Sequence, residues 1–435
     1  MSELYLRVYT NKSELVLPDG SVQTFDEGEM SQSAQLRYQK ISEELSKDYL
    51  ERQILICRDR CSDLDFSQLR QEHQDLLERL LKSVTSEVGR ALVGLTILQL
   101  CVKSIEPKQN IRLHKGSKST RDFSWRDGIS MRSLDKRYIT PVLRKYELLR
   151  LNADGFMMTR SLAENYPYSR VYKAKIRGAR FEWISIVDAI EEEDLDPALG
   201  LQYLLSQLLN QADNFRQLSI KIADNLNLFL DSTLINQKIG FDLITEHISR
   251  SDYAARLMEV AMHSLMQAVQ EYEGFPNGSL RPLSQMRSAN KKQGNLGDIE
   301  LLEDGEVIEA WDAKYGKSYL RDEIEELSEK LAVISTVRRA GFVTSVEPER
   351  LEELNSRCEE LEQIYGVSIQ VLRLEQWIEE QFKVATTLEE ELASAWLKAY
   401  VESLAQQRRE MAPIDEPCYQ WLLRLDEILM EKLVN

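Results

Sequence analysis

The stretch GNLGDIELLEDGEVIEAWDAKYGKSY, residues 294–319, decides how the C-terminal half of this chain folds. Two strand-like runs, 298–302 and 307–314, lie on either side of Asp304-Gly305. An Asp-Gly pair between two such runs is typical of a tight turn in a β-hairpin. We therefore expect two antiparallel strands joined by a short loop.

Both expected strands carry charged side chains at one end. Asp298 opens the first strand, and Asp312 and Lys314 close the second. Successive side chains point to opposite faces of a strand, so Asp312 and Lys314 share a face. A two-residue loop would place Asp298 opposite Trp311, and therefore on the other face. The two aspartates can share a face if the hairpin contains an odd-length loop or a bulge, and we expect one.

Two carboxylates and an ammonium group gathered at strand ends suit hydrolysis of a phosphodiester bond. Carboxylate oxygens bind hard cations such as Mg²⁺. The ion stabilises charge on the phosphate and lowers the pKa of a bound water. A lysine can orient or deprotonate that water. The pattern therefore predicts a Mg²⁺ site at Asp298 and Asp312, with Lys314 beside it.

An aspartate followed one strand later by Asp-x-Lys resembles the PD-(D/E)xK nuclease superfamily, which includes most type II restriction endonucleases. The resemblance covers residues 253–382, where predicted helices and strands alternate. Gly297 stands where the family name has proline. The resemblance implies a restriction-endonuclease-like domain with a mixed sheet flanked by helices.

The resemblance also implies roles for individual residues. Asp298 and Asp312 match the metal-binding acids of the superfamily, and Lys314 matches its catalytic lysine. Members often have a further metal-binding glutamate on the preceding helix, and Glu259 is the best match for it. The implied catalytic set is therefore these four residues.

The fold class expected for the whole chain is α+β, with several domains and helix-rich N-terminal and middle regions. The expected segments are 1–105, an N-terminal hairpin with a helical region; 106–182, a basic DNA-contacting module; 183–250, a helical connection; 251–385, the nuclease domain; and 386–435, C-terminal helices.

Positive charge is concentrated in one segment of an acidic chain. The net charge is −17, yet residues 103–180 contain 19 Lys and Arg against 7 Asp and Glu, a net of +12. Such a segment is typical of a surface that meets phosphates. A predicted helix followed by a hairpin at Asn152–Gly155 gives it the outline of a winged helix. The DNA contacts expected here are His114, Lys115, Lys118, Arg121, Arg126, Arg132, Lys136, Arg137, Arg144 and Lys145.

Other classes of protein fit the sequence less well. The five cysteines are odd in number and scattered, which argues against a zinc site. No apolar run approaches the length of a membrane span. The N-terminus does not have the pattern of a secretory signal, so we expect a cytoplasmic location. No phosphate-binding loop of the full form G-x-x-x-x-G-K-[S/T] is present, so no nucleotide cofactor is expected.

These observations predict a type II restriction endonuclease that cleaves double-stranded DNA with Mg²⁺. Cutting both strands with one active site per chain favours a homodimer. One alternative is a modification-dependent or anti-phage nuclease on the same core, because DAKYGK also resembles a strand end of such enzymes. The other is a non-enzymatic winged-helix DNA-binding regulator, which would leave the acids and the lysine without a role.

Overall fold

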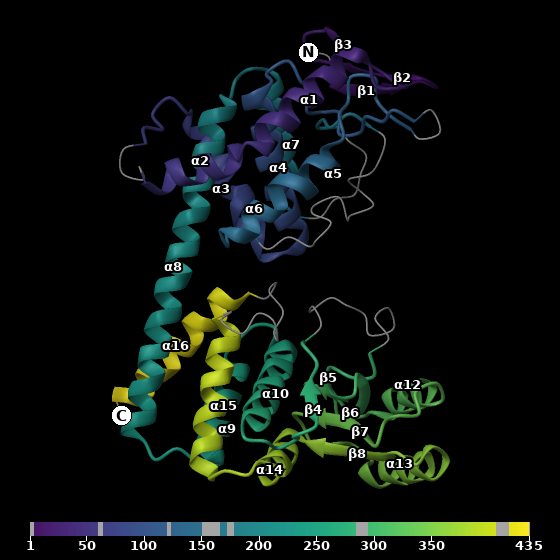
Figure 1. The fold of residues 1–435 in the computed structure, drawn as a ribbon, viewed down its shortest axis with the longest axis vertical. Coiled ribbons are helices and arrows are strands. Elements are labelled where there is room, and N and C mark those ends of the chain that lie inside the picture. The colour runs from purple at the N-terminus through teal and green to yellow at the C-terminus, as the bar shows by residue number, and fades with distance from the viewer. Residues whose placement is uncertain are drawn as a thin grey trace. The chain divides into compact units, whose positions relative to one another are not determined.

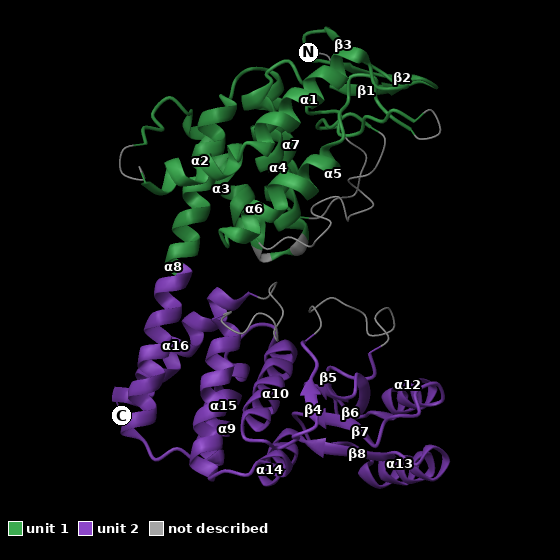
Figure 2. Ribbon diagram, in the orientation of Figure 1, with its two compact units in different colours: residues 1–214 green, residues 215–435 purple. Residues whose placement is uncertain are grey.

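The computed structural model describes residues 4–59, 64–119, 123–149, 166–171, 178–283, 295–405 and 417–434 (Figure 1). The chain divides into two compact units, residues 1–214 and 215–435 (Figure 2). The expected α+β class, with a mixed sheet flanked by helices, is confirmed. The five expected segments therefore lie in two units, each of which is described by itself below.

Unit 1 begins with a three-stranded antiparallel sheet. Its strands are β1 (Tyr5–Val8), β2 (Lys12–Val16) and β3 (Val22–Asp26), in that order. A turn at residues 18–20 joins β2 to β3, and Gly20 has a φ of +89° there. The N-terminal hairpin expected from the sequence is therefore part of a three-stranded sheet.

The rest of unit 1 is helical and encloses one core. The helices are α1 (Gln32–Ser46), α2 (Tyr49–Asp59), α3 (Gln71–Lys82), α4 (Glu87–Ile105), α5 (Met131–Leu134), α6 (Thr140–Lys145), α7 (Arg180–Glu191) and the first part of α8 (Pro197–Ser232). The basic segment is part of this core, because Ile129, Leu134 and Leu143 are buried in the same cluster as Leu95 of α4. The hairpin expected at 152–155 lies outside the described residues.

Helix α4 shows why length and composition alone do not identify a membrane span. Among the described helices, only Val88–Ile105 is long and apolar enough to cross a membrane, and 78% of it is buried inside the protein. The sequence analysis had found no run of this kind. Burial on all sides explains the composition, since a central helix has no face that needs polar residues.

Unit 2 is built on a five-stranded mixed sheet of order β4-β5-β6-β7-β8. The strands are β4 (Gly278–Leu280), β5 (Ile299–Glu303), β6 (Glu306–Lys314), β7 (Arg339–Thr344) and β8 (Ser368–Arg373). The first three strands are antiparallel, and β6, β7 and β8 are parallel. The strands expected at 298–302 and 307–314 correspond closely to β5 and β6.

Helices cover both faces of this sheet (Figure 1). On one face, Ala310 and Phe342 pack with the apolar residues of α12 (Arg321–Leu331) and α13 (Leu351–Tyr365). On the other, Trp311 and Val343 belong to a larger core. The helices of that core are the second part of α8, α9 (Gln237–Ser249), α10 (Ala254–Glu271), α14 (Leu374–Val384), α15 (Glu389–Leu404) and α16 (Cys418–Val434).

The register of the β5–β6 hairpin places Asp298 opposite Asp312. Glu303 pairs with Glu306 across a two-residue turn, but the pairing shifts by one residue at Ile308, so that Leu301 pairs with Glu309. Ile299 then pairs with Trp311, and the preceding residue, Asp298, lies opposite Asp312. The expectation of a bulge is confirmed. This single extra residue brings both aspartates to the same face of the sheet.

Candidate active site

Asp298 lies immediately before β5 and is in close contact with β6. Its backbone N–H donates to the Trp311 carbonyl (2.9 Å), and its carboxylate accepts from the Ala313 N–H (3.0 Å). A Cβ atom at Gly297 would lie 2.7 Å from the Trp311 carbonyl oxygen, which is too close for any side chain. Glycine in place of the family's proline therefore allows β5 to approach β6 this closely.

The carboxylate of Asp298 lies in an unfavourable place for a negative charge. Burial raises the pKa of Asp298 well above its ordinary value, and the neighbouring carboxylates of Asp312 and Glu259 raise this pKa further. Two acids this close disfavour simultaneous ionisation. A cation between them would remove that penalty.

Lys314 contacts the second aspartate directly. Its Nζ lies 2.7 Å from Oδ2 of Asp312, and both side chains are mostly buried. The two residues alternate with Ala313 along β6, which packs partly against the core on the opposite face. The expected common face for Asp312 and Lys314 is therefore present in the structure.

Glu259 reaches the same place from α10. Burial raises the pKa of Glu259, and the charge of Asp312 adds to this rise, while Arg256 and Lys314 oppose it. Arg256 lies one turn earlier on α10, is 4% exposed and forms an ion pair with Glu259. The four residues implied by the family resemblance are thus neighbours, although they come from three elements.

The donor set fits a magnesium ion. It consists of carboxylate oxygens, and Mg²⁺ typically takes one or two carboxylates and fills its other positions with water and substrate phosphate. In the part of the chain that the structure describes, no three acidic, histidine or cysteine side chains are already grouped to hold an ion. Asp312 is ion-paired with Lys314, and Glu259 with Arg256. Asp298 and Asp312 lie opposite one another at the strand ends and form the candidate pair of ligands.

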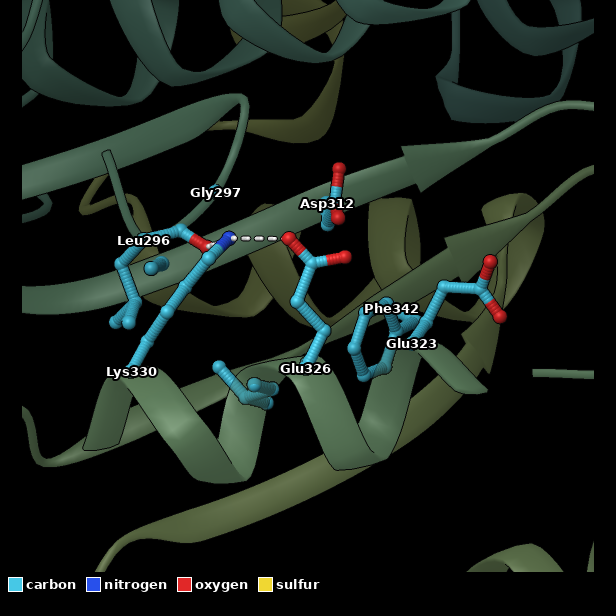
Figure 3. Close-up of a pocket in the computed structure, with 10 residues that line it drawn as sticks. Leu296, Gly297, Asp312, Glu323, Glu326, Lys330 and Phe342 are labelled. Atoms are coloured by element: carbon cyan, nitrogen blue, oxygen red, sulfur yellow. Dashed lines mark hydrogen bonds and ion pairs between the residues drawn. The ribbon is translucent and has the colours of Figure 1, made fainter. Parts of the chain in front are cut away.

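A small pocket opens beside Asp312, on the side of the sheet covered by α12 (Figure 3). Its volume of about 20 Å³ has room for about one water molecule. Glu326 and Lys330, one turn apart on α12, line it and form an ion pair of 3.8 Å. One oxygen of Glu323 is buried without a hydrogen-bond partner among the described residues. The sequence analysis missed these α12 residues, because nothing in their spacing relates them to β6.

Glu300 is a buried acid that the sequence analysis also missed. It is 1% exposed, forms an ion pair with Arg281, and accepts from the backbone N–H groups of Leu296 (2.5 Å) and Gly297 (3.3 Å). These contacts hold the loop from which Asp298 projects. A signal was present, because a glutamate two residues after Asp298 in an apolar strand lies on the same face as Asp298.

The expected DNA contacts of the basic segment are mostly at the surface. Lys118, Arg126, Arg132, Lys136, Arg137, Arg144 and Lys145 are exposed, and Lys115 is partly exposed. Lys145 is ion-paired with Glu51 at 2.5 Å. Arg121 lies outside the described residues.

His114 is not a surface residue, contrary to expectation. It is 2% exposed, and its ring stacks on Tyr168 with centroids 4.9 Å apart. Burial lowers the pKa of His114 to about 4, so the ring is neutral at physiological pH. A neutral, buried imidazole is not a phosphate contact, and the local run HKGSK gave no indication of the burial.

No protein-family model matches this chain, and no curated protein matches it in sequence.

Proposed function

We propose that this chain is a Mg²⁺-dependent deoxyribonuclease with a restriction-endonuclease-like domain, and specifically a type II restriction endonuclease. The observation that supports this most is the bulge at Ile308. It sets Asp298 opposite Asp312, whose carboxylate lies 2.7 Å from the ammonium group of Lys314. A hairpin with the same two-residue turn and no bulge would place the two acids on opposite faces of the sheet.

Each residue of the candidate active site then has a distinct role. Asp298 and Asp312 would hold Mg²⁺, which when bound stabilises charge on the scissile phosphate and lowers the pKa of a bound water. Lys314 is placed to orient that water and to stabilise negative charge on the phosphate. Glu259 is a possible further ligand once Arg256 releases it, and Glu300 holds the backbone beneath Asp298.

Double-stranded DNA is the substrate that fits the charge distribution. The exposed basic residues of the segment 103–180 would contact phosphates on the duplex. With one candidate active site per chain, cleavage of both strands calls for two copies related by a two-fold axis.

The test is cleavage of supercoiled plasmid with and without Mg²⁺. Asp312→Asn and Lys314→Ala should each lower the cleavage rate by at least about a hundredfold, since a positioned acid–base group contributes roughly 10²–10⁴. Matched controls are Asp322→Asn and Lys383→Ala, which change exposed residues outside the site. Both controls should cleave like wild type.

Two outcomes would contradict the proposal. A wild-type cleavage rate in Lys314→Ala would contradict the catalytic role of Lys314. Binding of plasmid without any Mg²⁺-dependent cleavage would favour a non-enzymatic regulator. Methylated and unmethylated DNA should be compared in the same assay. Cleavage confined to the methylated DNA would favour the modification-dependent nuclease instead.

A further inference from the structure

Unit 1 contains a second polar pocket, which shares no residue with the candidate active site. It lies between α3 and α7 and has a volume of about 440 Å³. This volume falls within the roughly 300–1,000 Å³ that is typical of small-molecule sites. No part of the nuclease proposal assigns a role to it.

The lining of this pocket includes apolar side chains and one exposed aromatic ring. Leu76 and Ile184 line the pocket, and Phe181 stands at it with 73% of its surface exposed. The guanidinium of Arg180 lies 5.8 Å from the centre of the Phe181 ring. An exposed phenylalanine on a pocket offers a flat surface on which a planar ligand can stack.

The lining also presents hydrogen-bond donors. Arg70 is ion-paired with Asp194 at 2.8 Å, and Arg170 with Asp188 at 2.9 Å. The Nε2 atom of buried His73 lies 3.0 Å from Arg70 and must accept from it, because arginine only donates. Each guanidinium has five N–H donors, more than these contacts use, and both side chains are more than half exposed.

The lining presents hydrogen-bond acceptors as well. Glu72, Glu192 and Asp194 line the pocket, so three carboxylates accompany two guanidinium groups. This excess of negative charge disfavours a free phosphate as the ligand. A suitable ligand instead has its own N–H donors for the carboxylates, carbonyl acceptors for the arginines and a flat face for Phe181.

We propose that this pocket binds a nucleobase of unpaired DNA, with guanine as the best match. Guanine offers O6 and N7 to an arginine, which is the commonest specific contact to this base. Its N1 and N2 hydrogens suit a carboxylate acceptor. The proposal rests on the proposed function in that it assigns base recognition to unit 1, while cleavage belongs to unit 2. A base read in this way leaves the helical stack, as enzymes that act on single bases require.

The experiment measures binding in EDTA, where no metal-dependent cleavage occurs. Two fluorescein-labelled single strands are compared by anisotropy, one of thymines only and one with a single guanine among thymines. We expect the guanine strand to bind wild-type protein about tenfold more tightly, which is the discrimination of one bidentate arginine contact. Replacing both Arg70 and Arg170 by alanine should abolish this difference, and Phe181→Ala should weaken the binding of both strands. Leu36→Ala, which truncates a 60% exposed side chain of α1 outside the pocket, should leave both the affinities and the difference unchanged.

Competition by small molecules separates the base from the phosphate. Free deoxyguanosine should displace the guanine strand, and deoxyribose 5-phosphate should not. Equal competition by the sugar phosphate, or an unchanged guanine preference in the double arginine variant, would overturn the proposal. Plasmid cleavage by wild type keeps the two proposals apart. Cleavage without a guanine preference would contradict only the base-binding proposal. A guanine preference without cleavage would contradict only the nuclease proposal.

Discussion

At the scale of single residues, the buried acids of unit 2 differ in how their charge is balanced. Glu300 has an arginine and two backbone N–H groups as partners. Asp298 has one backbone N–H and faces two other carboxylates. A buried acid with full hydrogen bonding stabilises a loop, whereas one whose pKa is raised by like charges is typical of functional sites. This contrast distinguishes Glu300, which holds the loop, from Asp298, which is the candidate metal ligand.

Asp135 gives a pH prediction at the same scale. It is fully buried in unit 1, and burial raises its pKa to about 7, which two contacts from the Thr140 hydroxyl only partly offset. Because the folded-state pKa exceeds the ordinary value of 3.8, its contribution to stability is present below pH 3.8 and is lost as pH rises to about 7. Asparagine cannot ionise and avoids this loss.

Asp135→Asn should therefore raise the free energy of unfolding more at about pH 8 than at about pH 5, by roughly 2–3 kcal/mol. Denaturant melts at the two pH values measure the difference. Asp127→Asn, at a 63% exposed position of the same segment, is the control and should show no such pH dependence. An equal effect of Asp135→Asn at both pH values would mean that Asp135 does not titrate in this range.

At the scale of elements, the hairpin was predictable because its determinants are local. The turn Asp304-Gly305 and the alternation of side chains predict the two strands. A shared face for Asp298 and Asp312 requires an irregular register, which the bulge at Ile308 supplies. The burial of His114 and the approach of α12 to Asp312 depend on residues distant in the chain. Local patterns contain no information about such contacts, which explains why those parts of the sites were not predicted.

One alanine inserted between Asp298 and Ile299 tests the hairpin as a unit. The insertion should move Asp298 to the face opposite Asp312 and leave the pairs from Ile299 onward in place, because a one-residue shift reverses the side chains beyond it. A ligand that binds the folded state alone raises its melting temperature. We expect Mg²⁺ to raise the melting temperature of wild type but not of the insertion variant.

The matched control inserts one glycine after Gly305 instead. The extra residue then lies in the loop, and the pairs between β5 and β6 stay in register. The Mg²⁺ effect should be retained in this control. If the insertion before Ile299 also kept the Mg²⁺ effect, the register would not create the metal site.

At the scale of the whole molecule, the chain has separate hydrophobic cores joined through one helix. In α8, Leu204 and Leu208 belong to the core of unit 1, and Ile222 and Phe229 to a core of unit 2. Between these sets, the side chains of residues 210–217 are exposed or only partly buried. Five segments were expected because composition changes along the chain, but buried side chains define two units. The basic segment and the C-terminal helices each complete a core begun elsewhere.

The two units should therefore unfold separately. Leu95→Ala, in the core of unit 1, and Leu265→Ala, in a core of unit 2, both remove fully buried side chains. Each should destabilise its own unit by about 2–5 kcal/mol. Calorimetry of the full chain should show two transitions, each substitution lowering one melting temperature and leaving the other unchanged. If either substitution lowered both melting temperatures, the two units would not unfold independently.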